Sequence, residues 1–231
     1  MTTTTPRERA REQTLAEITR IGREHLATHG AAALSLRAVA RDLGVVSSAV
    51  YRYVASRDEL LTLLVVDGYD ELGGEVDSAV DAVPTGDHRG RMHALARAVR
   101  AWALREPARY ALLFGSPVPG YHAPAERTTG PGTRVVVAMV GIIEAAYRAG
   151  GVVPPATPID PGLKLDLDRI RGEMGLTVPD DLLARGVMAW SALFGAVNFE
   201  VFGQYGADTF VDPAALFEHH LVVLDQILGL A

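Results

Sequence analysis

Cysteine is absent from this chain of 231 residues, so disulfide bonds and thiolate chemistry are excluded. Lysine is nearly absent too, because Lys164 is the only one and arginine supplies the other cations. The longest apolar runs are broken by charged residues or glycine, so no segment is predicted to span a membrane. No apolar stretch follows the basic residues near the N-terminus, which argues against a secretory signal. These absences favour a soluble, cytoplasmic protein that does not bind membranes.

Sequence patterns typical of catalysis and metal binding are also missing. The seven histidines show no metal-ligand spacing, and the adjacent His219 and His220 would point about 100° apart on a helix. Neither a glycine-rich phosphate loop nor a Gly-x-Ser-x-Gly elbow occurs. We therefore predict no metal site, no cofactor and no enzymatic activity.

The charge is distributed unevenly along the chain. The net charge is −6, yet residues 1–60 hold nine arginines against seven carboxylates. A basic N-terminal segment (residues 1–60, here called the head) on an acidic remainder (the body) is typical of a protein that contacts DNA at one end only. An apolar content of 48% is ample for a sizeable core.

The apolar spacing predicts an all-α chain without period-two strands. Capping boxes at 5–8 and 56–59 mark the starts of two helices. The predicted helices cover about 6–29, 36–44, 47–53, 57–80, 89–105, 107–114, 134–150, 163–175, 180–205 and 212–228. Proline- and glycine-rich loops are predicted at 115–132 and 151–162.

The most informative segment is 34–61, which reads LSLRAVARDLGVVSSAVYRYVASRDELL. Ala40, Gly44 and Val50 supply the small residue, the turn residue and the buried apolar residue that a helix-turn-helix requires. Such a motif places one short helix in the major groove of DNA.

Residues 36–40, 43–45, 49–53 and 56–61 resemble the TetR family of transcriptional regulators. This resemblance implies an N-terminal three-helix bundle with a helix-turn-helix, here 1–56, and a larger helical ligand-binding and dimerisation domain, here 57–231. It also implies a homodimer on a palindromic double-stranded operator, which usually represses transcription until a small molecule releases it.

Eight residues are expected to contact DNA from the second and third helices and from the start of the fourth. Serine hydroxyls at the start of the recognition helix suit phosphate or base acceptors, and an alanine there suits a thymine methyl. The tyrosines and the flanking arginines suit phosphates, a role that the resemblance supports for Arg37, Tyr51, Tyr53 and Arg57. The predicted DNA contacts are Arg37, Ser47, Ser48, Ala49, Tyr51, Arg52, Tyr53 and Arg57.

Alternatives remain for two groups in this head. Tyr51 could instead be a core aromatic that braces the three helices. Arg7, Arg9 and Arg11 could form an arm in the minor groove, or simply belong to a frayed terminus.

Aromatic and apolar residues of the body are expected to surround the family's ligand pocket. They are Trp102, Tyr110, Phe114, Met139, Ile143, Tyr147, Trp190, Phe194 and Asn198. Core packing is the alternative for each one alone. Glu144, Asn198 and Glu200 are isolated polar groups that need either a ligand or a protein partner, such as Arg100 or Arg97 for Glu144. With so little charge available, the expected effector is mostly apolar, aromatic or polycyclic.

The last two helices carry the prediction of a dimer. Small residues that permit close helix approach alternate with large apolar ones. The stripe consists of Ala189, Ala192, Gly195, Ala196, Phe199, Leu216, Leu221, Leu224 and Leu228. The alternative is that these helices cover only their own core.

The sequence therefore predicts a ligand-responsive DNA-binding regulator, most simply a repressor that acts as a homodimer. An orphan regulator without a small-molecule ligand is the first alternative. An α-helical enzyme that retains a DNA-binding head is the remote one.

Overall fold

The structure is a computed structural model that describes residues 5–152 and 157–230. As predicted, the fold is all-α, and the described residues form no strand beyond an isolated bridge between Val152 and Leu230. The helices are α1 (Pro6–His29), η1 (Ala31–Ala33), α2 (Leu36–Asp42), α3 (Ser47–Tyr51), α4 (Arg57–Asp81), α5 (His88–Arg105), α6 (Pro107–Phe114), α7 (Ala125–Arg148), α8 (Pro161–Met174), α9 (Asp180–Val201) and α10 (Pro213–Leu228).

Within the described residues the chain forms two compact units. Unit 1 comprises residues up to 71 together with 105–132, and unit 2 comprises 72–104 together with 133 onwards. The expected boundary after residue 56 therefore falls inside unit 1. Helices α4 and α7 each contribute residues to both units.

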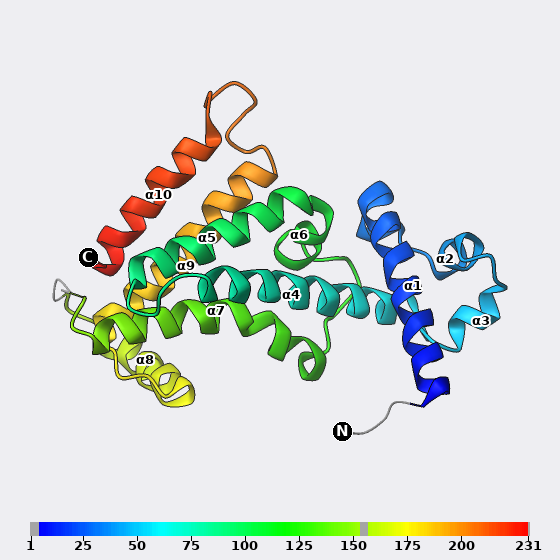
Figure 1. Ribbon diagram of the computed structural model, residues 1–231, viewed down its shortest axis with the longest axis horizontal. Helices are drawn as coiled ribbons and strands as arrows, with labels where there is room; N and C mark the ends of the chain where they lie inside the picture. The colour runs from blue at the N-terminus through cyan, green and yellow to red at the C-terminus, as the bar shows by residue number, and fades with distance from the viewer. Residues whose placement is uncertain (1–4, 153–156, 231) are drawn as a thin grey trace. The chain divides into compact units, whose positions relative to one another are not determined.

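Unit 1 contains the three helices of the head, which Figure 1 shows together at the blue end of the chain. The predicted capping box is confirmed at the start of α1, where the Thr5 hydroxyl accepts from the Glu8 amide and the Glu8 carboxylate accepts from the Thr5 amide. The core of the head is built from buried aliphatic side chains contributed by α1, α2, α3 and α4. Among them are Ile18, Ile21, Leu36, Val39, Val50, Leu60 and Leu64, and Leu34 joins them from the turn before α2.

Three predicted boundaries in unit 1 are wrong. Val46, not a serine, is the N-cap of α3, and α3 ends at Tyr51, so Tyr53 lies in the turn that follows. Helix α7 begins at Ala125, inside the segment predicted as a loop, and contains Pro131.

Tertiary contacts explain why this proline- and glycine-rich segment is helical. Arg127 forms an ion pair with Glu59 of α4 at 2.8 Å. The Thr128 hydroxyl donates to the Pro124 carbonyl at 3.0 Å. A Cβ on Gly132 would lie 3.3 Å from the Tyr69 ring, so glycine permits α7 to approach α4 closely.

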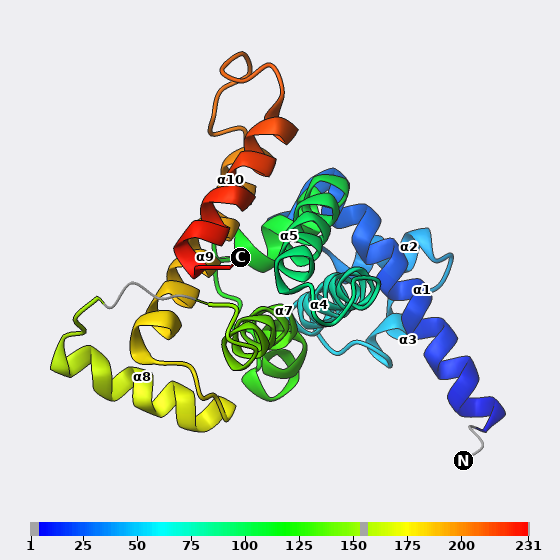
Figure 2. The same cartoon turned by 60° about the vertical axis from the view of Figure 1, so that its left-hand side comes forward.

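Unit 2 is built around α9, which contacts both α8 and α10 (Figure 2). Trp102 and Val99 of α5 are fully buried in its core, as are Leu182 and Val197 of α9. In the described part of the chain, α9 is the one helix long and apolar enough to cross a membrane, but a core helix passes the same test. The predicted loop at 151–162 lies partly outside the described residues.

Candidate functional site

The turn of the helix-turn-helix has the predicted geometry. Gly44 has a φ of +73°, a conformation that favours glycine, and its amide donates to the Arg41 carbonyl at 3.0 Å. The Val45 amide donates to the Ala40 carbonyl at 3.0 Å. Ala40 and Val50 are each 1% exposed, so α2 and α3 are packed directly against each other. This packing fixes the orientation of α3.

The residues predicted to contact DNA divide into two groups by exposure. Four of them are exposed: Arg37, Ser48, Tyr51 and Arg52. Ser47, Ala49, Tyr53 and Arg57 are half-buried. Tyr51 is 46% exposed, which disfavours the alternative that it is a core aromatic.

A cationic groove lies between the start of α1 and the end of α3. Its volume is about 790 Å³, and its lining includes Arg7, Arg11, Arg52 and Tyr53. The Arg11 guanidinium carbon lies 5.7 Å from the centre of the Tyr53 ring, within the range of a cation–π contact. Arg7 and Arg11 lie in the first turns of α1, which begins at Pro6 behind its capping box. No local sequence pattern predicts that α1 and the end of α3 form a shared groove.

Arg57 holds the head together in a way that the sequence did not reveal. Its guanidinium donates to the carbonyls of Ala31 and Ala32, at 2.9 and 3.3 Å, and so links α4 to the short η1 turn. About a third of the side chain remains exposed. Arg57 therefore has a structural role within unit 1. The contact of Arg57 with a DNA phosphate stays a prediction.

A second pair of contacts positions α2 against α1. His25 Nε2 lies 2.6 Å from Asp42 Oδ2. The hydrogen bonds from His25 and then Arg41 lower the pKa of the Asp42 carboxyl. Asp42 ends α2, so this contact fixes the helix that precedes the turn.

Buried Arg109 is the largest electrostatic feature of unit 1, and sequence reasoning missed it. It is 3% exposed and donates to Asp67 and Glu71 of α4, each at 2.8 Å. Arg23 of α1 donates through Nε to the same Asp67 at 2.7 Å. This network ties α1, α4 and α6 together, and long-range ion pairs of this kind leave no local pattern in a sequence.

The predicted ligand residues are distributed over both units. Tyr110 and Phe114 belong to unit 1, where their ring centroids are 5.1 Å apart and Phe114 also meets Tyr69. Burial raises the pKa of the Tyr110 hydroxyl. The other seven residues belong to unit 2.

Unit 2 contains an apolar cavity of about 220 Å³ between α7, α8 and α9. Three of the predicted residues, Met139, Ile143 and Trp190, line it. The remaining lining residues are Val136, Val140, Ile170, Met174, Val178, Leu182, Leu183, Gly186 and Val187.

The other predicted residues of unit 2 do not line this cavity. Trp102 is fully buried in the core, as the packing alternative expects. Phe194 stacks on Trp190 with a centroid distance of 4.2 Å, and therefore supports the cavity wall from outside. Tyr147 is half-buried, and the side-chain oxygen Oδ1 of Asn198 is buried without a hydrogen bond from any described residue.

Glu144 has protein partners, but not those expected from the sequence. Its carboxylate accepts from the amides of Thr177 and Val178, at 2.9 and 3.2 Å, and from Arg148 Nε at 2.6 Å. Burial raises the pKa of Glu144, but hydrogen bonds from Thr177, Arg148 and Val178 together outweigh it, so the pKa lies below its usual value. The pairing of Glu144 with Arg100 or Arg97 is wrong, since these arginines bind Glu200 and Glu218.

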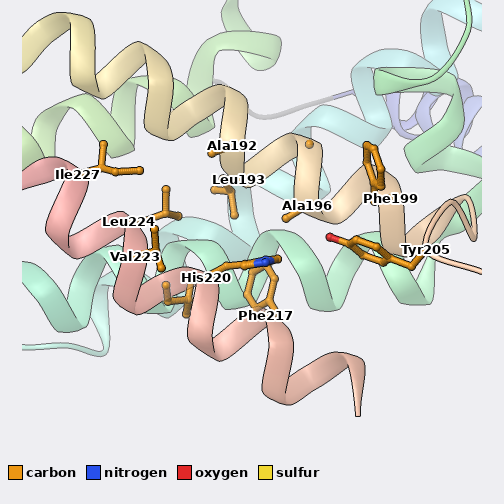
Figure 3. A pocket seen from close by; sticks show the side chains of 12 residues that line it. Ala192, Leu193, Ala196, Phe199, Tyr205, Phe217, His220, Val223, Leu224 and Ile227 are labelled. Carbon is orange, nitrogen blue, oxygen red and sulfur yellow. The ribbon is translucent and has the colours of Figure 1, made fainter. Parts of the chain in front are cut away.

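The predicted dimerisation stripe is only partly available at the surface. Ala189, Leu221, Leu224 and Leu228 are buried within the protomer. A groove of about 330 Å³ between α9 and α10 is lined by six residues of the stripe, namely Ala192, Gly195, Ala196, Phe199, Leu221 and Leu224. Figure 3 shows side chains of both helices directed into this groove, among them Leu193, Ala196, Phe217 and His220.

Several apolar side chains in this groove and beside it are exposed to solvent. Met188 and Phe199 of α9 are 57% and 46% exposed, and Val222 and Val223 of α10 are 41% and 38% exposed. A surface of this kind marks a contact site more often than a plain solvent face. As for metals, the described residues contain no group of three His, Cys, Asp or Glu that could hold an ion.

Comparison with known proteins identifies the kind of protein to which this geometry belongs. The family model for bacterial regulatory proteins of the tetR family matches residues 18–64, and the model for the tetracyclin repressor-like C-terminal domain matches residues 92–224. An HTH-type transcriptional regulator of Mycobacterium tuberculosis (Rv1816) is 48% identical over 223 residues, which cover 96% of this chain and 95% of the relative. A regulator of Mycobacterium bovis (Mb1846) matches equally well, with the same identity and coverage.

Solved structures agree with this assignment. The crystal structure of the regulatory protein SCO4313 superposes with a TM-score of 0.77 at 37% identity, covering 95% of this chain and 98% of that one. A tetR-family protein from Rhodococcus RHA1 shares the fold, with a TM-score of 0.62 at 17% identity over 94% of this chain and 97% of that one. These relatives are regulators, a class without enzymatic activity. The chain belongs to the TetR family of transcriptional regulators and carries its helix-turn-helix DNA-binding domain.

Proposed function

We propose that this protein is a cytoplasmic, homodimeric repressor that binds a palindromic operator and is released from it by a small, mostly apolar molecule. The observation that carries the ligand-responsive part is the apolar cavity of about 220 Å³ in unit 2 of a chain whose unit 1 holds a DNA-binding motif. Close packing is the rule in protein interiors, so a void of this size has a cost in stability that a bound ligand would remove.

In this proposal α3 reads the operator in the major groove. Ser47, Ser48 and Ala49 lie at its N-terminal end, where an inserted helix meets base edges. Arg37 and Arg52 are exposed on either side of the turn and suit backbone phosphates. The cationic groove beside Tyr53 adds a further phosphate-binding surface.

The groove between α9 and α10 is the proposed contact between protomers. Two such helix pairs would form a four-helix interface and bury the exposed apolar side chains of both copies. One helix-turn-helix alone reads too few base pairs for selectivity, which favours a dimer with recognition helices about 34–40 Å apart.

Val223→Asp tests this interface, because it places a charge on the exposed apolar face of α10. Light scattering at micromolar concentration should give a dimer for the wild type and a monomer for the variant. Leu165→Asp is the matched control, since Leu165 is 73% exposed on α8, outside this groove. A monomeric wild-type protein would refute the proposed interface.

Release from DNA requires a two-state protein. The ligand must bind more tightly to the form whose recognition helices are wrongly spaced, because equal affinity for both forms shifts nothing. Helix α4 contributes residues to both units, and it is the proposed lever between ligand and DNA.

The testing experiment begins with an operator selected from random duplex DNA by the purified protein. A thermal-shift screen against neutral apolar and aromatic compounds follows, and each hit is retested for release of that operator. A ligand at about 100 times its Kd adds about 2.7 kcal/mol of stability. For a chain of this length that corresponds to roughly 5–10 °C in Tm.

A hit that also frees the operator supports the proposal. A hit that leaves DNA bound contradicts release by that ligand. A broad panel without any hit favours an orphan regulator, and turnover of a bound compound would favour an enzyme.

A further inference from the structure

Helix α8 covers the apolar cavity but is weakly anchored. It contributes Ile170 and Met174 to the cavity wall, and the loop after it contributes Val178. Leu167 is its only fully buried residue within the described part of the chain. Two of its leucines, Leu163 and Leu165, are 45% and 73% exposed. A helix with so few buried contacts opens at a small free-energy cost.

Polar contacts hold α8 and its loop at two points. The first joins α8 to the start of α9: Arg171 pairs with Asp180, and its Nε donates to the Val178 carbonyl at 3.0 Å. Lys164 also lies 3.0 Å from Asp180. These contacts stay within the segment formed by α8, its loop and the start of α9, so they do not attach it to α7.

The second point is Glu144, which does attach this segment to α7. The side chain is 11% exposed and accepts from two successive loop amides, those of Thr177 and Val178. The Thr177 hydroxyl donates to the same carboxylate at 2.5 Å. Glu144 directly follows Ile143 and lies one helical turn after Val140, both of which line the cavity. The carboxylate therefore sits at the edge where the cavity wall of α7 meets the covering loop.

We propose that α8 is a lid on the apolar cavity and that Glu144 is the latch that controls entry of an uncharged, hydrocarbon-like ligand of one or two rings. This inference rests on the proposed function, because it requires that the cavity bind a ligand. Opening the lid breaks the hydrogen bonds to Glu144 and leaves α7 and most of α9 in place.

Size and chemistry of the cavity set the ligand class. A cavity of about 150 Å³ in another protein holds benzene, and typical pockets for drug-sized ligands begin near 300 Å³. At about 220 Å³ this cavity has room for one or two rings. All of its lining side chains are apolar, so a polar group on the ligand would be buried without a partner and weaken binding by roughly tenfold or more.

Iodobenzene is a suitable probe, since it is uncharged, has one ring and quenches tryptophan fluorescence on contact through its heavy atom. Trp190 lines the cavity, whereas fully buried Trp102 does not. Quenching that disappears in Trp190→Phe therefore reports occupancy. Stopped-flow measurement then gives the association and dissociation rate constants.

The latch variant is Glu144→Ala in the full chain. Both the association and the dissociation rate constant of iodobenzene should rise by about tenfold or more, while its Kd changes much less. The reason is that the fraction of molecules with α8 open limits both entry and exit of the probe. Amide hydrogen exchange at Thr177 and Val178 should accelerate in parallel. Glu144→Gln retains one carbonyl acceptor and should give intermediate rates, and it serves if the alanine variant folds poorly.

Glu200→Ala is the matched control. Glu200 is also a poorly exposed carboxylate, at 13%, and pairs with Arg100 at 2.7 Å, but it does not line the cavity. Its loss should lower stability and leave the probe's rate constants unchanged.

The outcomes separate the two levels of the proposal. If iodobenzene does not quench Trp190 in the wild type, the cavity does not admit a ligand of this class and the lid is refuted, while the thermal-shift screen decides separately whether the protein binds another ligand. If it quenches but Glu144→Ala leaves both rates unchanged, only the lid is refuted. Equal acceleration in Glu144→Ala and Glu200→Ala would mean general loosening, which also overturns the latch.

Discussion

Gly186→Ala is the substitution whose effect on the cavity can be worked out most fully. Gly186 lies in the interior of α9, is buried, and lines the cavity. A Cβ built there would lie 3.3 Å from Ile143 Cδ1, a few tenths of an ångström closer than ordinary contact. Because Ile143 itself borders the void, its terminal methyl has space to move away.

Two favourable contributions are expected from this change. Alanine is about 1 kcal/mol better than glycine in a helix interior. Burying one additional methyl group adds about 0.8 kcal/mol if the group fills empty volume. The sum is about 1–2 kcal/mol, or roughly 2–8 °C in Tm for a chain of this length.

Gly141→Ala separates these contributions. Gly141 is exposed in the interior of α7, and a Cβ there meets nothing within 4 Å, so only the helix-propensity gain of about 1 kcal/mol applies. Urea unfolding followed by circular dichroism gives both free energies, and iodobenzene quenching of Trp190 gives the occupancy. Gly186→Ala should be the more stable variant and should bind the probe less tightly than the wild type.

The result that would refute this reasoning is a Gly186→Ala protein less stable than the wild type with unchanged probe affinity. It would mean that Ile143 has nowhere to move and that the space beside Gly186 is not a usable cavity.

Three further predictions concern charged groups. Arg109→Met should destabilise the protein by about 2–3 kcal/mol, because the half-buried carboxylates of Asp67 and Glu71 lose the donor that they share. Arg23→Ala, whose side chain is 37% exposed, should cost about 1 kcal/mol or less in urea unfolding. Since hydrogen bonding holds the pKa of Glu144 below its usual value, the stability it contributes is present above that usual value and lost as pH falls through the lowered one. The deficit of Glu144→Gln relative to wild type should therefore shrink on acidification, and a constant deficit would contradict this. Arg57→Ala should weaken binding to all DNA sequences and reduce the slope of log K against log salt concentration by about one unit. It should also lower Tm, because the carbonyls of Ala31 and Ala32 lose their donor. An unchanged slope would remove Arg57 from the phosphate contacts.

The head could be predicted from the sequence because its determinants are local. The Thr5 and Ser56 caps, the positive φ of Gly44 and the burial of Val50 all act over a few residues. Local signals of this kind can be recognised in a single sequence. The same reasoning predicted α10 from Asp212 and the proline after it, which the structure confirms.

The predictions that were wrong concern residues whose partners are distant in the chain. Pro131 and its flanking glycines predict a loop, but the segment is helical and contacts α4 through the ion pair between Arg127 and Glu59. Glu144 was expected to bind a ligand or to pair with Arg97 or Arg100, but it pairs with Arg148 on its own helix and accepts from amides 33 and 34 residues away. Main-chain donors are present at nearly every position, so the sequence cannot single out those two.

The cavity illustrates a different limit. Met139, Ile143 and Trp190 were predicted for it, but each is an ordinary core residue by type, and the void arises only from how α8 meets α7 and α9. The types of the residues predict that the site is apolar, but they do not predict that it contains an empty volume. The sequence could therefore indicate the apolar lining of this cavity, but not its volume.

Helix α9 connects the proposed ligand site with the proposed dimer contact. Its first half lines the cavity with Leu183, Gly186 and Trp190, and its second half lines the groove toward α10 with Ala196 and Phe199. A helix moves largely as a rigid rod, so a shift imposed at the cavity is carried along its axis to the groove. A ligand that prefers one position of α9 would thereby favour one arrangement of the protomers, and this differential affinity is what release from an operator requires.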